Sequence, residues 1–209
     1  MIDLHTFNTP NGRKVSIALE EMELPYTVHS VNIMEDEQFD PAFLAISPNN
    51  KIPAIVDGDR ELSLMESGAI LFYLATKTGK FLPADPHEYW QCMEWLFWQV
   101  GGYGPMLGQA GHFLTFNKGK SEYGEKRYGE EAQRLYKVMD DHLAGNDYLG
   151  GSEYSIADMA TWPWTAGFKM HGVSLDDYPN VRRWYSDIAA RPAVQRGYSV
   201  PDPAEIPQP

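Results

Sequence analysis

Residues 49–57 read N-N-K-I-P-A-I-V-D, and this stretch decides the fold. The apolar residues after the proline form a short strand signal, and proline is tolerated where a strand opens. Asp57-Gly58-Asp59 follows as a hairpin turn signal, and a second strand signal, L-S-L, occupies residues 62–64. The sequence therefore predicts two short paired strands in the N-terminal part of the chain.

Strand and helix signals alternate around this hairpin. Strands are predicted at residues 2–7 and 26–32, and helices at residues 12–23 and 41–46. A further helix with an apolar face opens at Glu66-Ser67. The predicted order is β-α-β-α-β-β-α, an α/β domain over residues 1–79.

The remainder of the chain carries helical signals only. Gly79, Pro83 and Pro86 mark residues 80–86 as a linker. An all-α C-terminal domain is predicted over residues 87–209, with a frayed proline-rich tail. Its predicted helices span residues 87–116, 125–144, 156–171 and 181–190, and a short turn is predicted near residues 192–198.

The composition narrows the classes of function. A chain of 209 residues with 43% hydrophobic and 22% charged residues is typical of a globular protein. A formal net charge of -12 disfavours binding to nucleic acid and to anionic lipid. The chain has neither a long uncharged apolar run nor a secretory signal, which predicts a cytoplasmic protein. One cysteine and six scattered histidines predict no metal site.

Two loops have the residues to bind a small ligand. The spacing leaves open whether Pro53 simply opens a strand or forms a cis bond that presents the Ile52 backbone to an extended peptide. Ser67 is a plausible helix N-cap, and the simplest interpretation is a capped helix. A helix N-terminus also attracts carboxylates, and Glu66 suits an ammonium group, so the pair fits an α-amino-acid head group.

A third loop, T-P-N-G at residues 9–12, lies where a thiol-redox protein would carry two cysteines. Its residues are ordinary ones for a turn and a helix start. The Thr9 hydroxyl and the Asn11 amide are also donors that stabilise a thiolate. Lowering a thiol pKa of ~8.5 by ~2 units requires about 2.7 kcal/mol. Two hydrogen bonds to a charged group supply that amount, so no protein cysteine is needed.

The element order and the motifs T-P-N-G-R-K, N-K-I-P-A-I-V-D and E-S-G-A-I together resemble the cytosolic glutathione transferases, over essentially the whole chain. More specifically, T-P-N-G and W-L-F-W-Q-V-G-G-Y-G-P-M-L-G-Q at residues 95–109 are similar to the bacterial nu class, whose members resemble glutathione-dependent disulfide-bond oxidoreductases. The resemblance implies a thioredoxin-like N-terminal domain, glutathione as cosubstrate and a homodimer.

The resemblance also implies a set of glutathione-binding residues. These are Gln38, Lys51, Ile52, Pro53, Glu66, Ser67 and Arg134. Ile52 would pair through its backbone with the cysteinyl part of glutathione, and Pro53 would be the cis proline. Glu66 and Ser67 would hold the γ-glutamyl head. Arg134 would reach the carboxylates of the tripeptide, from its own subunit or from the partner of a dimer.

The predicted activity is reduction of a small disulfide by a bound glutathione thiolate. Its catalytic residues would be Thr9 and Asn11, and the sequence leaves open which is the main donor. One alternative is a transferase that conjugates glutathione to electrophiles or reduces peroxides. Another is a non-catalytic regulator or scaffold, which predicts degraded I-P or E-S motifs, whereas both motifs are intact here.

Three features of the helical domain complete the predictions. Cys92 has no C-x-x-C partner, and it is interpreted as a small buried side chain. Ser155-Ile156-Ala157-Asp158 fits a capping box. Residues 101–109 are rich in glycine, which weakens a helix and indicates close approach of a ligand or a partner backbone. We expect this segment to line the cleft of the second substrate.

Overall fold

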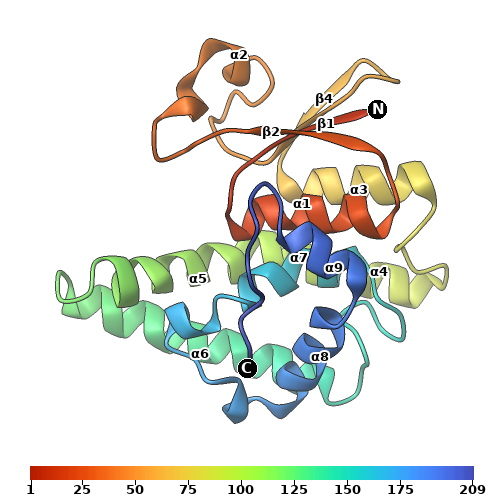
Figure 1. Cartoon of the computed structure of the whole chain (residues 1–209). Coiled ribbons are helices and arrows are strands. Elements are labelled where there is room, and N and C mark those ends of the chain that lie inside the picture. Colours follow the sequence, from red (N-terminus) through yellow and green to blue (C-terminus); the bar gives the residue numbers. More distant parts are fainter. The chain divides into compact units, whose positions relative to one another are not determined.

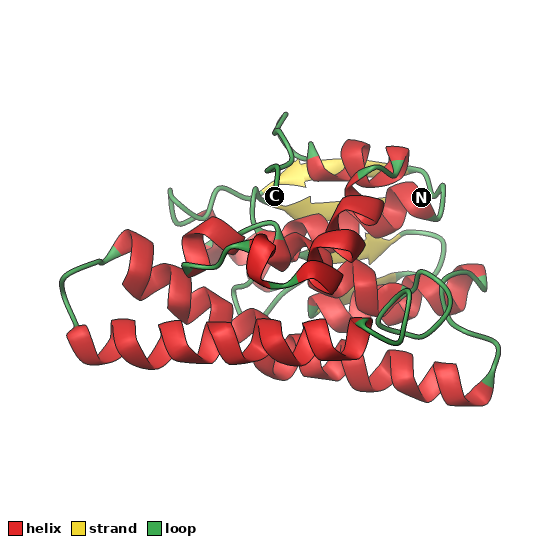
Figure 2. Cartoon of the chain, turned by 90° about the horizontal axis from the view of Figure 1, so that it is seen from below, coloured by secondary structure: helices red, strands yellow, loops and turns green.

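The computed structural model describes all 209 residues, which form two compact units. The first unit comprises Met1–Lys80 and Ala190–Ile206, and the second comprises Phe81–Ala189 and Pro207–Pro209. The strands belong to the first unit, and the second is built from helices and loops (Figure 2). The predicted combination of an α/β domain with an all-α domain is confirmed.

The first unit is a four-stranded sheet covered by helices. Its elements are β1 (Ile2–Thr6), α1 (Pro10–Glu21), β2 (Tyr26–Ser30), a 3-10 turn (Glu37–Phe39), α2 (Pro41–Leu44), β3 (Ala54–Asp57), β4 (Leu62–Met65), α3 (Ser67–Thr78) and α9 (Pro192–Tyr198). The strand order is β2-β1-β3-β4, in which β1 and β2 are parallel and β3 is antiparallel to both of its neighbours. Helices α1 and α3 lie along one face of the sheet, and α2 lies on the opposite side (Figure 1). The predicted β-α-β-α-β-β-α order is confirmed.

Alternation along β1 sets the two faces of the sheet. Ile2, Leu4 and Thr6 are buried, as the period of two in a strand requires. Leu4 pairs with Ile55 of β3, and both are fully buried. Each such side chain contributes about 1.5 to 3 kcal/mol of hydrophobic free energy.

The helix α9 belongs to the first unit, whereas the sequence-based boundaries place all of residues 87–209 in the helical domain. A Cβ atom on Gly197 would lie 2.5 Å from the Cα of Ile17, so glycine is what allows α9 to approach α1 so closely. The Ser16 hydroxyl donates to the Gly197 carbonyl at 2.6 Å. Long-range contacts therefore place this short helix in the first unit, although in the sequence it follows the helices of the second unit.

The second unit is built from helices. Its elements are α4 (Pro86–Trp98), a π-helical turn (Gln99–Tyr103), α5 (Gly104–Gly111), a second π-helical turn (His112–Phe116), α6 (Glu122–Leu143), α7 (Ile156–Thr165), two 3-10 turns (Phe168–His171 and Leu175–Asp177) and α8 (Pro179–Ala189). The single helix predicted over residues 87–116 is thus interrupted twice. Gly101 and Gly102 fall in the first interruption, where they disfavour regular helix by about 1 kcal/mol each. No helix of the chain is long and apolar enough to cross a membrane.

Two glycines of α5 pack against the indole ring of Trp164 on α7. A Cβ atom on Gly104 or on Gly108 would lie 3.3 Å from that ring. The close approach predicted for this glycine-rich segment is therefore made, at these two positions, by a side chain of the same unit.

Asp158 forms a buried polar centre of the second unit. The predicted capping box is present, because the Ser155 side chain accepts from the Asp158 backbone N–H and the Ser155 backbone N–H donates to Asp158 Oδ2 at 2.9 Å. The Ser155 hydroxyl also donates to Asp158 Oδ2, at 2.9 Å. The other oxygen, Oδ1, accepts hydrogen bonds from Leu149 N–H at 2.9 Å and from Trp184 Nε1 at 2.8 Å. One carboxylate thus joins the start of α7 to the preceding loop and to α8.

The last residues of the proline-rich tail make specific hydrogen bonds, whereas the sequence predicts fraying. The Tyr185 hydroxyl donates to the Pro207 carbonyl at 2.7 Å, and Lys169 Nζ donates to the Gln208 carbonyl at 3.2 Å. Proline lacks a backbone donor but keeps its carbonyl acceptor, so a proline-rich segment can still be bound through its carbonyl groups.

Candidate functional site

Six of the predicted site residues line one cavity of the first unit, which has a volume of about 150 Å³. Its walls come from the first turn of α1, the loop that precedes β3, and the junction between β4 and α3. The lining residues are Asn11, Ser47, Asn49, Lys51, Ile52, Pro53, Met65, Glu66 and Ser67. Segments that are far apart in the sequence therefore meet around one small volume.

The start of α1 brings Asn11, but not Thr9, to the wall of this cavity. Thr9 is the N-cap residue of α1, with extended backbone, and its Oγ1 accepts a hydrogen bond from Gly12 N–H at 3.1 Å. The hydroxyl hydrogen of Thr9 is still available for donation, since a hydroxyl both donates and accepts. Of the two predicted thiolate donors, Asn11 is the one that lines the cavity.

Gly12 allows α1 to begin this close to the end of β1. A Cβ atom at this position would lie 2.4 Å from both the Phe7 carbonyl oxygen and Thr6 Oγ1. No side chain fits at that distance without moving the loop. The residue type at position 12 therefore sets where Asn11 lies.

The loop before β3 contains the cis Ile52–Pro53 bond that the resemblance implies and the spacing left open. Pairing of β3 with β4 begins at Ala54, so Ile52 lies outside the strand ladder. The Ser47 hydroxyl donates to the Lys51 carbonyl at 2.8 Å, a hydrogen bond between two residues of this loop that stabilises its conformation. The Ile52 backbone is thus placed beside the cavity and next to a strand, as pairing with an extended peptide requires.

Helix α3 begins at Ser67, and its N-cap residue is Glu66, whereas the sequence predicts Ser67 as the N-cap. Glu66 has a φ of 68° and a ψ of 111°, a conformation that a non-glycine residue adopts only where its surroundings hold it. Its carboxylate makes no capping hydrogen bond. The first N–H groups of a helix lack intrahelical acceptors, so this end of α3 combines donors for a carboxylate with an acceptor for an ammonium group.

Lys14 is a residue of this region that the sequence analysis missed. It is 2% exposed, and its Nζ lies 3.3 Å from Ser67 Oγ. Burial lowers the pKa of Lys14 from 10.5 to about 7, and the Glu66 carboxylate partly opposes that shift. Lys14 follows Asn11 by three residues, a spacing that places both side chains on the same face of a helix. Lysines on helices are almost always exposed, so nothing in the sequence indicated that this one is buried.

Gln38 and Arg134 do not line this cavity, and their predicted contacts with glutathione remain predictions. Gln38 lies in the 3-10 turn before α2, where its Oε1 atom is buried and has no hydrogen-bond partner. Arg134 lies on α6 in the second unit. Its guanidinium donates to both carboxylate oxygens of Glu131, at 2.7 Å each.

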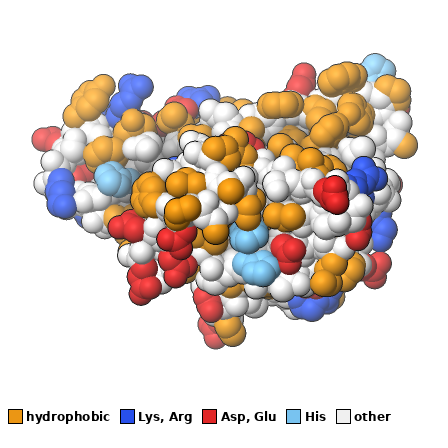
Figure 3. All heavy atoms as spheres, turned by 90° about the horizontal axis from the view of Figure 1, so that it is seen from above, with side chains coloured by type: hydrophobic (Ala, Val, Ile, Leu, Met, Phe, Trp, Pro, Cys, Tyr) orange, Lys and Arg blue, Asp and Glu red, His pale blue; other side chains and the backbone are white.

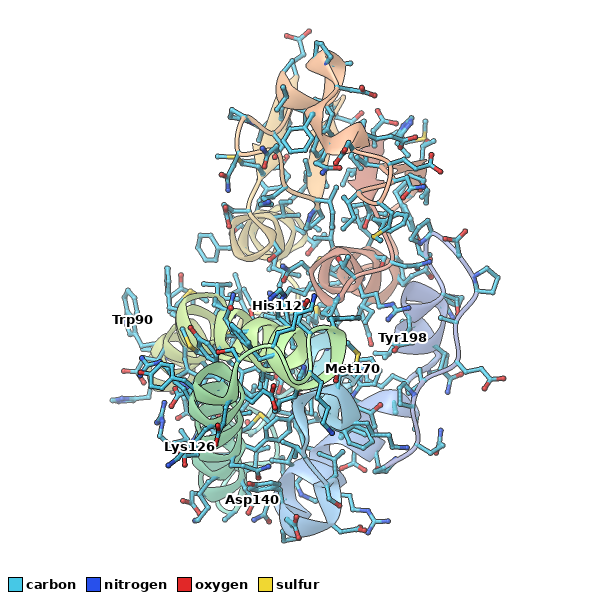
Figure 4. The ribbon with its side chains drawn as sticks, turned by 90° about the vertical axis from the view of Figure 1, so that its left-hand side faces the viewer. Trp90, His112, Lys126, Asp140, Met170 and Tyr198 are labelled. Atoms are coloured by element: carbon cyan, nitrogen blue, oxygen red, sulfur yellow. The ribbon has the colours of Figure 1, made fainter.

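The second unit has a larger cavity of its own, of about 710 Å³, with Arg134 on its wall. The lining residues are Gly102, Met106, Tyr123, Lys126, Arg127, Tyr128, Glu130, Glu131 and Arg134. Lys126 extends from α6 (Figure 4). Gly102 and Met106 come from the segment 101–109, whose role in binding a second substrate remains a prediction.

The second unit offers no reactive thiol. Cys92 lies on α4 and is 0% exposed, as predicted for a small buried side chain. Burial raises the pKa of the Cys92 thiol, which disfavours the nucleophilic thiolate.

The structure has no candidate metal centre and, on the face shown in Figure 3, no continuous basic patch. No group of three or more His, Cys, Asp or Glu side chains is arranged to hold a metal ion. On the face shown in Figure 3, the Lys and Arg side chains are separated by acidic and hydrophobic ones.

Comparisons with known proteins agree with both units. The family model described as glutathione S-transferase, N-terminal domain, matches residues 4–81, and the one described as glutathione S-transferase, C-terminal domain, matches residues 98–192. The disulfide-bond oxidoreductase YfcG of Escherichia coli strain K12 is 50% identical over 199 residues, which cover 93% of each chain.

Solved structures that are similar to this chain are also glutathione transferases. A glutathione transferase from Pseudomonas putida, with one glutathione disulfide bound per subunit, has a TM-score of 0.89 and 42% identity, covering 96% of this chain and 91% of that one. A family member from Pseudomonas fluorescens with two glutathione molecules bound has a TM-score of 0.88 and 44% identity, covering 96% and 93%. With family models matching both halves and relatives this similar, the chain belongs to the glutathione S-transferase family.

Proposed function

We propose that this protein is a glutathione-dependent disulfide-bond reductase in which glutathione supplies the reactive sulfur. The observation that carries this proposal is the cavity where Asn11, the Ile52–Pro53 backbone and the Glu66–Ser67 pair meet. These three groups match the sulfur, the cysteinyl backbone and the γ-glutamyl head of glutathione. The E. coli relative, named a disulfide-bond oxidoreductase, and the P. putida structure, which holds glutathione disulfide, support it.

The γ-glutamyl head is bound through complementary charges. Its carboxylate accepts hydrogen bonds from Ser67 and from the first N–H groups of α3, where the helix dipole also favours an anion. Its ammonium group lies against the Glu66 carboxylate. The Ile52 backbone pairs with the peptide as an added strand would. Gln38 and Arg134 are proposed as further contacts, and Lys51 adds a cation at the cavity.

The thiolate of glutathione is stabilised chiefly by Asn11. Its amide group is a donor on the cavity wall, at the second position of α1. A hydrogen bond to a charged group contributes roughly 1.5 to 3 kcal/mol, so one donor lowers a thiol pKa by about 1 to 2 units. Thr9 supports this arrangement by capping α1, and its hydroxyl hydrogen serves as a second donor.

The reaction consists of two thiol–disulfide exchanges. The bound glutathione thiolate attacks one sulfur of the substrate disulfide, forming a mixed disulfide and releasing the other sulfur as a thiolate that takes up a proton. A second glutathione thiolate then attacks the glutathione sulfur of the mixed disulfide and releases the second thiol. One disulfide is reduced to two thiols, and two glutathione molecules are oxidised to glutathione disulfide.

The first test is steady-state reduction of 2-hydroxyethyl disulfide by glutathione, with wild type and Cys92→Ala. Both are expected to turn over, within about twofold of each other, because Cys92 is buried and none of the exchanging sulfurs belongs to the protein. A chlorodinitrobenzene conjugation assay runs beside it.

Each contrary outcome selects a different function. Strong conjugation with negligible disulfide turnover would identify an electrophile-conjugating transferase. Failure of the purified protein to bind glutathione or its disulfide would identify a scaffold. Loss of turnover in Cys92→Ala, with the fold intact, would show that a protein sulfur takes part.

We further propose that the protein is a cytoplasmic homodimer. The cytoplasm keeps glutathione reduced, as the reaction requires. Helix α4 exposes Trp90 and Phe97, at 67% and 68%, and their spacing of seven residues places them on one helix face. Figure 4 shows Trp90 projecting from α4. Large exposed aromatic side chains of this kind are typical of an interface between subunits.

The dimer is tested by sedimentation velocity of wild type, Phe97→Glu and Met34→Glu. Phe97→Glu is expected to shift the protein toward the monomer, because a buried carboxylate at an apolar interface is costly. Met34→Glu is the matched control, since Met34 is also exposed, at 81%, but lies in the loop after β2 rather than on α4. A monomeric wild type, or equal shifts for both variants, would contradict the proposed interface.

A further inference from the structure

The loop before β3 carries a backbone donor, the N–H of Ile52, that makes no hydrogen bond within the chain. Strand pairing begins two residues later, at Ala54, so the sheet does not use this donor. The Ile52 side chain is half-buried and packs against a cluster formed by Val31, Phe43 and Ala54. An unused backbone donor of a residue that lines a cavity is available to a ligand.

The other half of the same peptide unit is held by Ser47. The Ser47 hydroxyl donates to the Lys51 carbonyl at 2.8 Å. The Lys51–Ile52 bond is trans, and in a planar trans peptide the C=O and N–H groups point in opposite directions. Because the Lys51 carbonyl points toward Ser47, the Ile52 N–H is directed away from Ser47 and out of the loop.

Ser47 is itself held in place by its surroundings. It is fully buried, and its backbone N–H donates to the Phe43 carbonyl at 2.8 Å, which attaches it to α2. Its own carbonyl accepts from the Asn50 N–H at 2.9 Å. Asn50 has a φ of 50°, a left-handed conformation that asparagine adopts more readily than most residues. The position of the Ser47 hydroxyl is therefore fixed before any ligand binds.

We propose that Ser47 is a positioning residue of the glutathione site: its hydroxyl sets the Lys51–Ile52 peptide plane so that the Ile52 N–H donates to the cysteinyl carbonyl of the bound tripeptide. This inference rests on the proposed function and deepens it, since it identifies the group that orients the peptide-binding donor. Without the hydroxyl, the Lys51 carbonyl gains a hydrogen bond by turning toward water, and this rotation turns the Ile52 N–H inward.

The first test compares Ser47→Ala with wild type in disulfide turnover and in calorimetric binding of S-methylglutathione. Loss of one hydrogen bond to the ligand should raise the KM for glutathione and the dissociation constant of S-methylglutathione by a similar factor, about three- to tenfold. The kcat at saturating glutathione should stay within about twofold, because the groups that contact the reacting sulfur are unchanged.

Amide hydrogen exchange of Ile52, followed by NMR, reports directly on the proposed donor. In wild type, saturating S-methylglutathione should slow exchange of this proton by about tenfold or more, because the ligand carbonyl accepts from it. In Ser47→Ala, at equal ligand saturation, exchange should slow by less than about threefold. A general loss of stability would not change the effect of the ligand at this one amide.

Three further variants separate the hydroxyl from a purely structural role. Ser47→Thr keeps the hydroxyl, and Ser47→Val has a side chain of nearly the same shape without it, so Ser47→Thr should bind about threefold or more tightly than Ser47→Val. Ser16→Ala is the matched control, because Ser16 is also fully buried and donates to a backbone carbonyl of the same unit, that of Gly197, at 2.6 Å. This variant should lose stability as Ser47→Ala does, but keep the affinity of wild type.

The outcomes are distinguishable. Equal affinities of Ser47→Thr and Ser47→Val, an equal loss of affinity in Ser16→Ala, or full protection of the Ile52 amide by ligand in Ser47→Ala would overturn the role of Ser47 while leaving the proposed function intact. If the Ser47 variants do not fold, exchange of the Ile52 amide in wild type that does not change on ligand binding would overturn it equally. Absence of S-methylglutathione binding by wild type would overturn the proposed function, and this inference with it.

Discussion

Replacing Asn11 with alanine is expected to raise the apparent pKa of bound glutathione by about 1 to 2 units, because one hydrogen bond to the thiolate is lost. Less thiolate is then present at neutral pH, which lowers the rate. The remaining thiolate is more nucleophilic because its pKa is higher, and this offsets a little under half of the decrease in the logarithm of the rate. Disulfide turnover at pH 6.5 should therefore fall by about three- to tenfold through this effect, and further where the amide also binds the ligand.

The pH profile separates this role from a loss of binding. The deficit of Asn11→Ala should shrink toward pH 9, where the thiol ionises without help, and the ultraviolet absorbance of the bound thiolate gives its pKa directly. Asn8→Ala is the matched control: Asn8 is three residues earlier, is exposed and contacts Asp202. Thr9→Ser keeps the cap and the hydroxyl, whereas Thr9→Ala removes both.

The comparison of these variants decides which donor dominates. A larger pKa shift in Thr9→Ala than in Asn11→Ala would assign the thiolate to Thr9, although that variant also loses the α1 cap, worth about 1 kcal/mol of stability. Wild-type turnover in Asn11→Ala at every pH would remove Asn11 from the mechanism. The geometry favours Asn11, because Asn11 lines the cavity and Thr9 does not.

Replacing Asp158 with alanine is expected to cost about 3 to 5 kcal/mol of unfolding free energy, because it breaks a buried hydrogen-bond network. Four donors, on Ser155, Leu149 and Trp184, point at this carboxylate. Alanine leaves all of them buried without an acceptor and removes the packing of the side chain, and each unsatisfied group costs about 1 to 3 kcal/mol before relaxation. Urea unfolding followed by circular dichroism measures the loss as a lower midpoint.

Asp141→Ala is the control for this measurement. Asp141 also lies in the second unit and pairs with Lys137, but both side chains are exposed, at 62% and 64%. Its removal should change stability by less than about 1 kcal/mol, as for exposed ion pairs in general. Similar losses in the two variants would show that the four hydrogen bonds to Asp158 contribute little.

Asp158 also shows which contacts can be predicted from the sequence and which cannot. The capping box with Ser155 is a local pattern, and the spacing of three residues predicts it directly. The bonds from Leu149 and Trp184 come from the preceding loop and from α8, which no local spacing connects to α7. The same limit applies to α9, whose contact with α1 depends on Gly197 meeting Ile17.

The candidate site divides in the same way. The motifs around Asn11, Ile52–Pro53 and Glu66–Ser67 were found from residue types and family resemblance, and the cavity brings all of them together. Lys14 was missed because a lysine on a short helix is ordinarily solvated, and nothing near it in the sequence indicates that it is buried against Ser67.

By itself, the sequence determined the order of strands and helices up to α3 and the capping box at α7, because periodicity, turn residues and caps act between residues a few positions apart. Residue types and family resemblance identified the loops that carry the site. Only the tertiary structure decided that Asn11 rather than Thr9 lines the cavity, that α9 joins the first unit and that Lys14 is buried with a pKa near 7. Burial and electrostatic environment depend on atoms from distant segments, and folding alone brings those atoms together.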